Sequence, residues 1–90
     1  MVIQNLGYYY MHKSMYSKAL QCYNRSIALN KDNPLAYCNR GILRYFILND
    51  QHGISDLFKA LRLKDNEATQ ILKIIATQRK GILKKYSNME

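Results

Sequence analysis

The sequence repeats itself once, at an offset that places Asn5 on Asn39 and Gly7 on Gly41. At the same offset, apolar residues at positions 20, 27 and 29 fall on apolar residues at positions 54, 61 and 63. A period of about 34 residues is typical of proteins in which each repeat is one supersecondary unit that buries its apolar face by stacking on its neighbour. The repeat therefore restricts the chain to a stack of two similar units, followed by a shorter third segment.

Each unit holds two segments with apolar residues at helical spacing, separated by short polar stretches, as a helix-turn-helix requires. Ser14 is the expected N-cap of the second segment and Asp50 that of the fourth, because their side-chain oxygens can accept hydrogen bonds from first-turn amides. Asn33 is expected to cap the third, with Pro34 at the first helical position, where it has no hydrogen bond to lose. The predicted helices run from the N-terminus to about His12, from Met15 to Leu29, from Pro34 to Leu48, from Asp50 to Leu63 and from Glu67 to about Lys85.

The large and small residues of the two units follow a known pattern. The first unit reads Ile3-x2-Leu6-Gly7-x2-Tyr10 and then Ala19-x3-Tyr23-x2-Ser26, and the second reads Tyr37-x2-Arg40-Gly41-x2-Arg44 and then Gly53-x3-Leu57-x2-Ala60. Residues 3–67 thus resemble two tetratricopeptide repeats, whose signature is W-x2-L-G-x2-Y, then A-x3-F, a small residue and P. Arg40, Arg44 and Gly53 depart from the usual residue types. Lys31 and Asp65 stand in the two proline places.

The resemblance implies an all-α fold, a right-handed α-α superhelix of two helix-turn-helix repeats and a fifth, C-terminal helix. The expected division is residues 1–33 for the first repeat, 34–67 for the second, 68–86 for a basic capping helix and 87–90 for a tail. The sequence Lys-Asp-Asn occurs at residues 31–33 and again at residues 64–66, an offset of 33 positions, whereas Asn5 and Asn39 are 34 positions apart. The register of the last helix is therefore open by one or two positions. Its apolar face, expected to cover the fourth helix, consists of Ala68, Ile71, Leu72, Ile75, Ile82 and Leu83.

The sequence holds no constellation of catalytic residues. His12 and His52 lie near predicted helix ends, and neither has a partner at nucleophile–base spacing. There is no Gly-rich phosphate loop and no metal-binding spacing of His and Cys, so an enzyme is not expected and no cofactor or metal is implied. A chain of 90 residues also leaves little room for a deep catalytic cavity.

Cysteine usage and hydropathy indicate a compartment. Cys22 and Cys38 have no clustered partners, which favours reduced thiols in the cytoplasm or another reducing compartment. The apolar stretches are far shorter than the roughly 20 residues that span a bilayer. The N-terminus shows no secretion signal. A soluble cytoplasmic protein is therefore expected.

The resemblance also implies a concave groove, lined by the first helices of successive units, that receives a peptide or helix of a partner protein. Aromatic and amide side chains suit such a surface, because aromatics bury a large area and an amide can bind a peptide backbone. For Tyr45 and Phe46, packing against the last helix remains an open alternative. The groove candidates are Asn5, Tyr8, Met11 and His12 from the first unit, Cys38, Asn39, Ile42, Tyr45 and Phe46 from the second, and Lys73 from the last helix.

One version of this binding is the carboxylate clamp, by which some members of the family hold acidic C-termini of heat-shock chaperones. Asn39-Arg40-Gly41 fits the middle of the clamp, and Lys73 can supply one cation. Gln4, Tyr8 and Thr69 stand where other clamp residues are required, so the clamp is disfavoured. The resemblance thus implies a non-enzymatic protein-interaction module of adaptor, scaffold or co-chaperone type. Its partner is expected to be acidic or mixed, because the basic last helix would repel cations.

Two alternatives belong to other classes. The last helix can contact nucleic acid or an anionic membrane through Arg79, Lys80, Lys84 and Lys85, which would neutralise phosphates. Self-association is the second alternative, because repeat stacks usually need three or more units for stability and this chain has two and a helix. Either the chain is part of a longer array, or a partner or a second copy covers its first helix.

Overall fold

The computed structural model describes residues 3–87 of the chain, and the side chains of residues 5–78. Helices make up most of this range and no strand occurs within it, so the prediction of an all-α fold is confirmed. The elements are α1 (Ile3–His12), α2 (Tyr16–Leu29), α3 (Pro34–Ile42), the π-helical turn η1 (Leu43–Ile47), α4 (His52–Arg62) and α5 (Asn66–Ser87).

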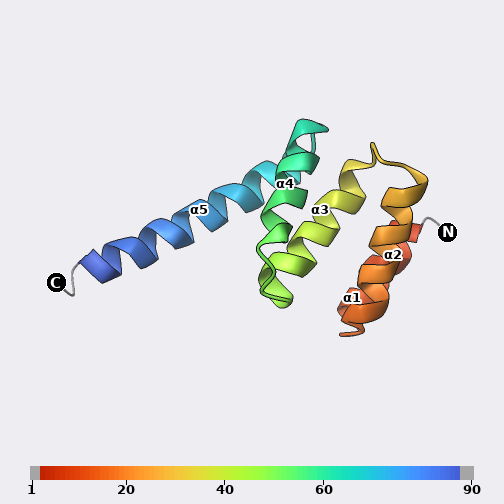
Figure 1. The fold of residues 1–90 in the computed structure, drawn as a ribbon, viewed down its shortest axis with the longest axis horizontal. Coiled ribbons are helices and arrows are strands. Elements are labelled where there is room, and N and C mark those ends of the chain that lie inside the picture. The colour runs from red at the N-terminus through yellow and green to blue at the C-terminus, as the bar shows by residue number, and fades with distance from the viewer. Residues whose placement is uncertain (1–2, 88–90) are drawn as a thin grey trace.

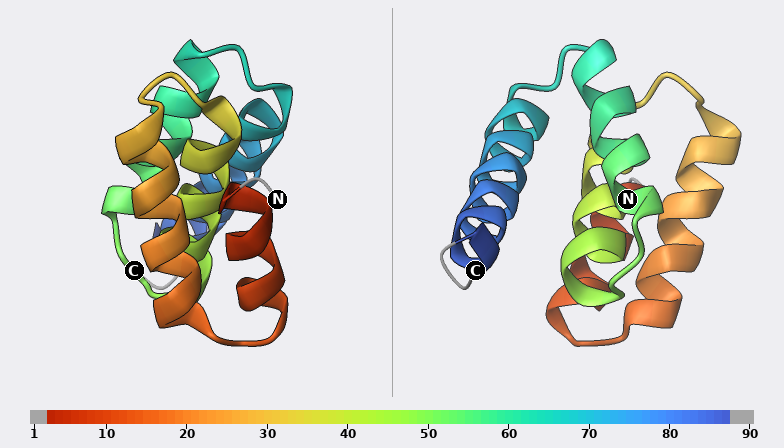
Figure 2. Two further views of the ribbon diagram at one scale, coloured as in Figure 1. Left: turned by 90° about the vertical axis from the view of Figure 1, so that its right-hand side faces the viewer. Right: turned by 60° about the vertical axis from the view of Figure 1, so that its left-hand side comes forward.

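The helices form a row in which each packs against the next along the chain (Figure 1). α1 pairs with α2 and α3 pairs with α4, which gives two helical hairpins, and α3 also contacts α1 and α2. α5 begins beside α4 and then extends away from the other helices, as Figure 1 and the right view of Figure 2 show. The molecule is therefore elongated, with extents of 52 × 28 × 16 Å. Within the described residues, no helix has the length and apolar character needed to cross a membrane.

One of the predicted caps is confirmed. The Asn33 side-chain oxygen accepts a hydrogen bond from the Ala36 amide at 3.4 Å, at the start of α3. The predicted cap at Asp50 is wrong: its carboxylate accepts a hydrogen bond from the His52 amide at 2.9 Å, but the N-cap of α4 is Gln51, whose side chain makes no cap hydrogen bond. α5 has an equivalent cap that was not predicted: the Asp65 carboxylate accepts from the Ala68 amide at 3.3 Å. The caps Asn33 and Asp65 are 32 positions apart, two fewer than the 34 positions between Asn5 and Asn39. The third unit therefore begins two positions early.

The predicted cap at Ser14 is wrong, because Ser14 ends α1 instead of starting α2. Its φ is 60°, in the left-handed region, and α2 begins after Met15, whose side chain makes no cap hydrogen bond. The amide of Met15 donates to the Tyr10 carbonyl at 2.9 Å, which satisfies a carbonyl at the end of α1. This is a Schellman-type ending, usually made with glycine at the left-handed position. Lys64, with φ 70°, ends α4 in the same way.

The third predicted helix is α-helical only as far as Ile42 and continues as the π-helical turn η1. The Leu48 amide donates to the Leu43 carbonyl at 3.0 Å, five positions back, which is the hydrogen bond of a π-turn. The turn precedes Asn49, which has a φ of 55°. Helix propensity alone does not distinguish this wider turn from an α-helix. The helix predicted from Pro34 to Leu48 therefore covers both α3 and η1.

The core consists of two clusters, one on each side of α3. The cluster between α1 and α2 also receives Leu43 from η1, and the other lies between α3, α4 and α5. In the second cluster, Ala68 and Ile75 of α5 are buried, with Ile71 and Leu72 packed beside them. The predicted packing of α5 is confirmed for these four residues, whereas the side chains of Ile82 and Leu83 lie outside the described residues. The clusters are Ala19, Tyr23 and Leu43, and Cys38, Leu57, Ala60, Ala68 and Ile75.

Tyr23 is a polar residue in the first cluster. It has no exposed surface, and its hydroxyl has no hydrogen-bond partner among the described residues. Burial, followed by the charges of Cys22 and Tyr8, raises the pKa of the phenol from 10.0 to about 12. The ring therefore supplies packing, whereas the unpaired hydroxyl opposes folding.

We expect Tyr23→Phe to raise the free energy of unfolding by about 1 kcal/mol near neutral pH, because it removes the unpaired hydroxyl and keeps the ring. Because the pKa of Tyr23 is raised in the folded state, its neutral phenol makes a contribution to stability that is fully present below pH 10. This contribution is lost as the pH rises towards 12, because the phenol of the unfolded chain ionises first. Tyr23→Phe lacks this loss. Urea unfolding at about pH 7 and about pH 11 measures both effects, with the exposed Tyr9→Phe as the neutral-pH control. A less stable Tyr23→Phe would mean that the hydroxyl has a partner.

Candidate functional site

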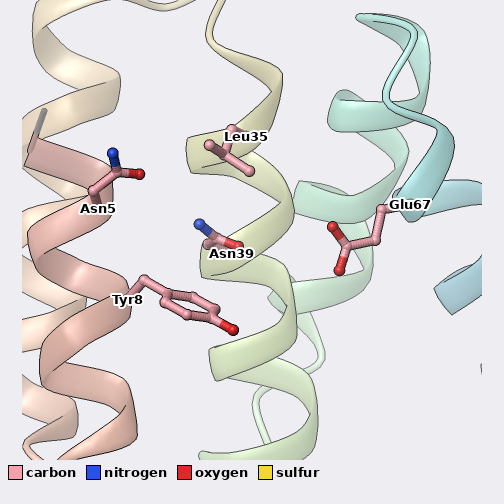
Figure 3. Close-up of a pocket in the computed structure, with 5 residues that line it drawn as sticks. All are labelled: Asn5, Tyr8, Leu35, Asn39 and Glu67. Carbon is pink, nitrogen blue, oxygen red and sulfur yellow. The ribbon is translucent and has the colours of Figure 1, made fainter.

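A pocket of about 320 Å³ lies where α1, α3 and the start of α5 face one another (Figure 3). α1 provides an amide and an aromatic ring, α3 provides an apolar side chain and a second amide, and α5 provides a carboxylate. In Figure 3 the α1 side chains extend towards α3, and the carboxylate points back towards α3 from the other side. The lining residues are Asn5, Tyr8, Leu35, Asn39 and Glu67.

Equivalent positions of three successive units build this pocket. Asn5 and Asn39 are related by the repeat period. Leu35 follows the cap Asn33 by two positions, and Glu67 follows the cap Asp65 by two positions. Residues three or four apart lie on one face of a helix, which keeps Tyr8 beside Asn5 and Asn39 beside Leu35. The pocket is therefore a product of the repeat and of the caps that set each register.

Asn39 is the central polar group of the pocket. The residue is only 7% exposed, and its side-chain amide makes no hydrogen bond to any described residue. The amide atoms of Asn39 are not among the fully buried, unpaired polar atoms of the described residues, so they reach the open pocket. The amide of Asn39 faces the pocket, where it has two donors and an acceptor available for a bound group.

The charge of the pocket comes from the start of α5. Cys38 Sγ and carboxylate oxygens of Asp65 and Glu67 lie within 4.8 Å of one another, close enough to hold a metal ion. Burial, followed by the charges of Asp65 and Glu67, raises the pKa of the Cys38 thiol from 9.0 to about 12. One Asp65 oxygen already accepts hydrogen bonds from the amides of Glu67 and Ala68. This arrangement serves to cap α5, and it leaves the Glu67 carboxylate at the pocket.

The arginines of the second unit are held away from the pocket by a buried carboxylate. Arg40 donates to both oxygens of Asp56, at 2.7 and 2.9 Å, and Arg44 donates to one of them at 3.1 Å. Arg40 also donates to the Asn24 side-chain carbonyl on α2 at 2.9 Å. The Asp56 side chain is only 7% exposed. The two arginines that depart from the repeat signature thus join α3, η1 and α4 instead of lining the groove.

Three of the predicted groove residues come together, namely Asn5, Tyr8 and Asn39. His12 is exposed beside them. Its ring centroid lies 4.3 Å from the ring centroid of Tyr8, in an edge-to-face arrangement. Leu35 and Glu67 also line the pocket but were not predicted. The signal that identifies Glu67 is the pair of caps at Asn33 and Asp65, which gives the register of the third unit.

Other predicted groove residues lie elsewhere. Cys38 has no exposed surface and belongs to the core cluster, so it offers no contact to a groove partner. Met11 packs on the first cluster, and Ile42 and Tyr45 pack on the second. Tyr45 therefore packs in the core beside α5, which was the alternative to a position in the groove.

Phe46 and Lys73 are exposed but do not line the pocket. Phe46 is 42% exposed, with its ring 5.1 Å from that of Tyr45. Lys73 follows Glu67 by six positions, which turns it by about 120° around the helix. The proposed anion-binding side chains of Arg79, Lys80, Lys84 and Lys85 lie outside the described residues, although the backbone there belongs to α5.

A family model described as TPR repeat matches residues 7–45 of the chain. The matched range runs from the middle of α1 into η1 and includes Tyr8, Leu35 and Asn39 of the pocket. No curated protein and no solved structure matches the chain. This match supports, over residues 7–45, the resemblance drawn from the spacing of the motif residues.

Proposed function

We propose that the chain, which a family model described as TPR repeat matches over residues 7–45, is a non-enzymatic interaction module that binds a peptide or helix of another protein between α1, α3 and α5. Repeats of this family generally mediate protein–protein interactions and are typically non-catalytic. The observation that carries the proposal is Asn39, a residue only 7% exposed whose side-chain amide opens into the pocket. A bound backbone amide would satisfy it.

The neighbours of Asn39 suit a polypeptide ligand. Tyr8 is 49% exposed and Leu35 is 38% exposed, so both offer apolar surface that a partner can cover. Tyrosine is favoured in such surfaces because it buries a large area at a low cost in conformational entropy. Asn5 provides a second amide on the opposite side of the pocket from Asn39 (Figure 3). A peptide lying across α1 and α3 would contact all four side chains.

Selection of a displayed library of random dodecamer peptides on the full chain tests this proposal. We expect peptides that lose affinity by about tenfold to a hundredfold on Asn39→Ala, because a hydrogen-bonding group lost from a buried contact costs about 1–3 kcal/mol. Asn30→Ala, at an exposed amide in the loop after α2, is the matched control and should bind as the wild type does. Peptides that bind the folded Asn39→Ala variant with unchanged affinity would place the binding surface elsewhere.

A further inference from the structure

We propose that the groove selects a cationic group of its partner, a lysine or arginine side chain, at the Glu67 end of the pocket. The inference rests on the proposed function and adds the charge of the ligand to it. Glu67 is the only charged residue among the five that line the pocket. The net charge of +8 favours an acidic partner at long range, but the contact itself is made with this carboxylate.

A second carboxylate strengthens the negative charge at this end. Carboxylate oxygens of Asp65 and Glu67 lie within 4.8 Å of each other and of the buried Cys38 sulfur. Both acids lie at the N-terminus of α5, where the helix dipole offsets only about half of one unit charge. Among the described residues, neither acid forms an ion pair. The pair thus remains available to a cation from outside.

The two arginines of the second unit do not reverse this charge. Arg40 and Arg44 are both bound to Asp56, which lies on α4. They cannot bind a partner carboxylate without releasing a side chain that is only 7% exposed. Lys73 lies on a different face of α5 from Glu67. The clamp of cations that holds an acidic C-terminus is therefore absent from the described pocket.

The other pocket groups are also able to bind a cation. The carbonyl oxygen of the Asn39 amide accepts hydrogen bonds, and a guanidinium or ammonium is purely a donor. The Tyr8 ring, 49% exposed, can receive the cation on its face. In Figure 3 this ring lies below Asn39, and the Glu67 carboxylate lies on the α5 side of it. One lysine or arginine side chain can thus be bound by a carboxylate, an amide oxygen and an aromatic ring.

The test repeats the peptide selection on the wild-type chain and on Glu67→Lys, in buffer with EDTA. We expect lysine or arginine to be enriched at one position by the wild type, and aspartate or glutamate at that position by Glu67→Lys. A wild-type peptide should bind Glu67→Lys about tenfold more weakly or worse. Asp32→Lys, in the exposed loop before α3, changes the net charge equally and should leave the cation preference intact. Glu67→Gln, which keeps the side-chain shape, should weaken the preference without replacing it.

The outcomes separate the two proposals. Peptides that depend on Asn39 but show no basic preference, or bind Glu67→Lys normally, would overturn the charge assignment and leave the peptide-binding function in place. Absence of any peptide that depends on Asn39 would overturn both. Titration with Co²⁺ in EDTA-free buffer tests whether a metal ion, instead of a cationic side chain, binds at Cys38, Asp65 and Glu67. A thiolate–cobalt absorption band that Glu67→Lys abolishes would assign these acids to a metal ion and overturn the proposal.

Discussion

Asp56→Ala is expected to lower the free energy of unfolding by about 3 kcal/mol, because it leaves two arginines beside each other without their shared partner. Arg40 makes a two-pronged contact with Asp56, and Arg44 adds a third hydrogen bond. The arginine side chains are 16% and 23% exposed, so water stabilises the released charges only in part. Urea unfolding followed by far-ultraviolet circular dichroism measures the loss.

The control for this variant is Asp32→Ala, which removes an exposed carboxylate that forms no ion pair within the described residues. It should change stability by less than about 0.5 kcal/mol. A double-mutant cycle between Asp56→Ala and Arg40→Ala isolates the direct interaction and should give a coupling energy above about 1 kcal/mol. Equal stability of Asp56→Ala and Asp32→Ala would show that the network does not join α3 to α4 in solution.

The helical architecture was predictable because it depends on short-range signals. Apolar residues at helical spacing gave the five helices, and Asn33 caps α3 through a side chain that the sequence names directly. Ser14 was not predictable in this way. A serine before a helical segment favours a cap, but here the same residue ends the preceding helix with a φ of 60°. The competing motif usually has glycine at that position, and no glycine marks it in this sequence.

The candidate site was predictable where the period is constant. Asn5, Tyr8 and Asn39 were found because the first two units keep the repeat period without insertion or deletion. Glu67 was missed because the third unit is displaced by two positions, which the cap at Asp65 produces. Cys38 was assigned to the groove although it is buried. Adjacent positions on a helix are turned by about 100°, so Cys38 faces the core while its neighbour Asn39 faces the pocket.

Gly53→Ala is expected to lower the free energy of unfolding by about 3 kcal/mol, at the upper end of the range for overpacked cores. A Cβ at Gly53 would lie 2.6 Å from the Gly41 carbonyl oxygen and 2.6 Å from the Tyr45 amide nitrogen. Both obstacles are backbone atoms, so α3 and α4 must separate along their closest contact. The gain of about 1 kcal/mol in helix propensity from glycine to alanine offsets only part of this cost. The urea midpoint and the thermal transition measure the net loss.

Gly7→Ala is the informative comparison, because its obstacle is a side chain. A Cβ at Gly7 would lie 2.6 Å from Cε1 of the buried Tyr23 ring. Gly7→Ala should therefore also destabilise the chain, but Tyr23→Leu in the same chain should restore part of the loss by shortening the obstructing side chain. No single side-chain replacement can relieve Gly53→Ala, because the carbonyl of Gly41 remains. If Gly53→Ala were as stable as the wild type, α3 and α4 would not be in contact through Gly41 and Gly53. The second hairpin would then be packed through other residues.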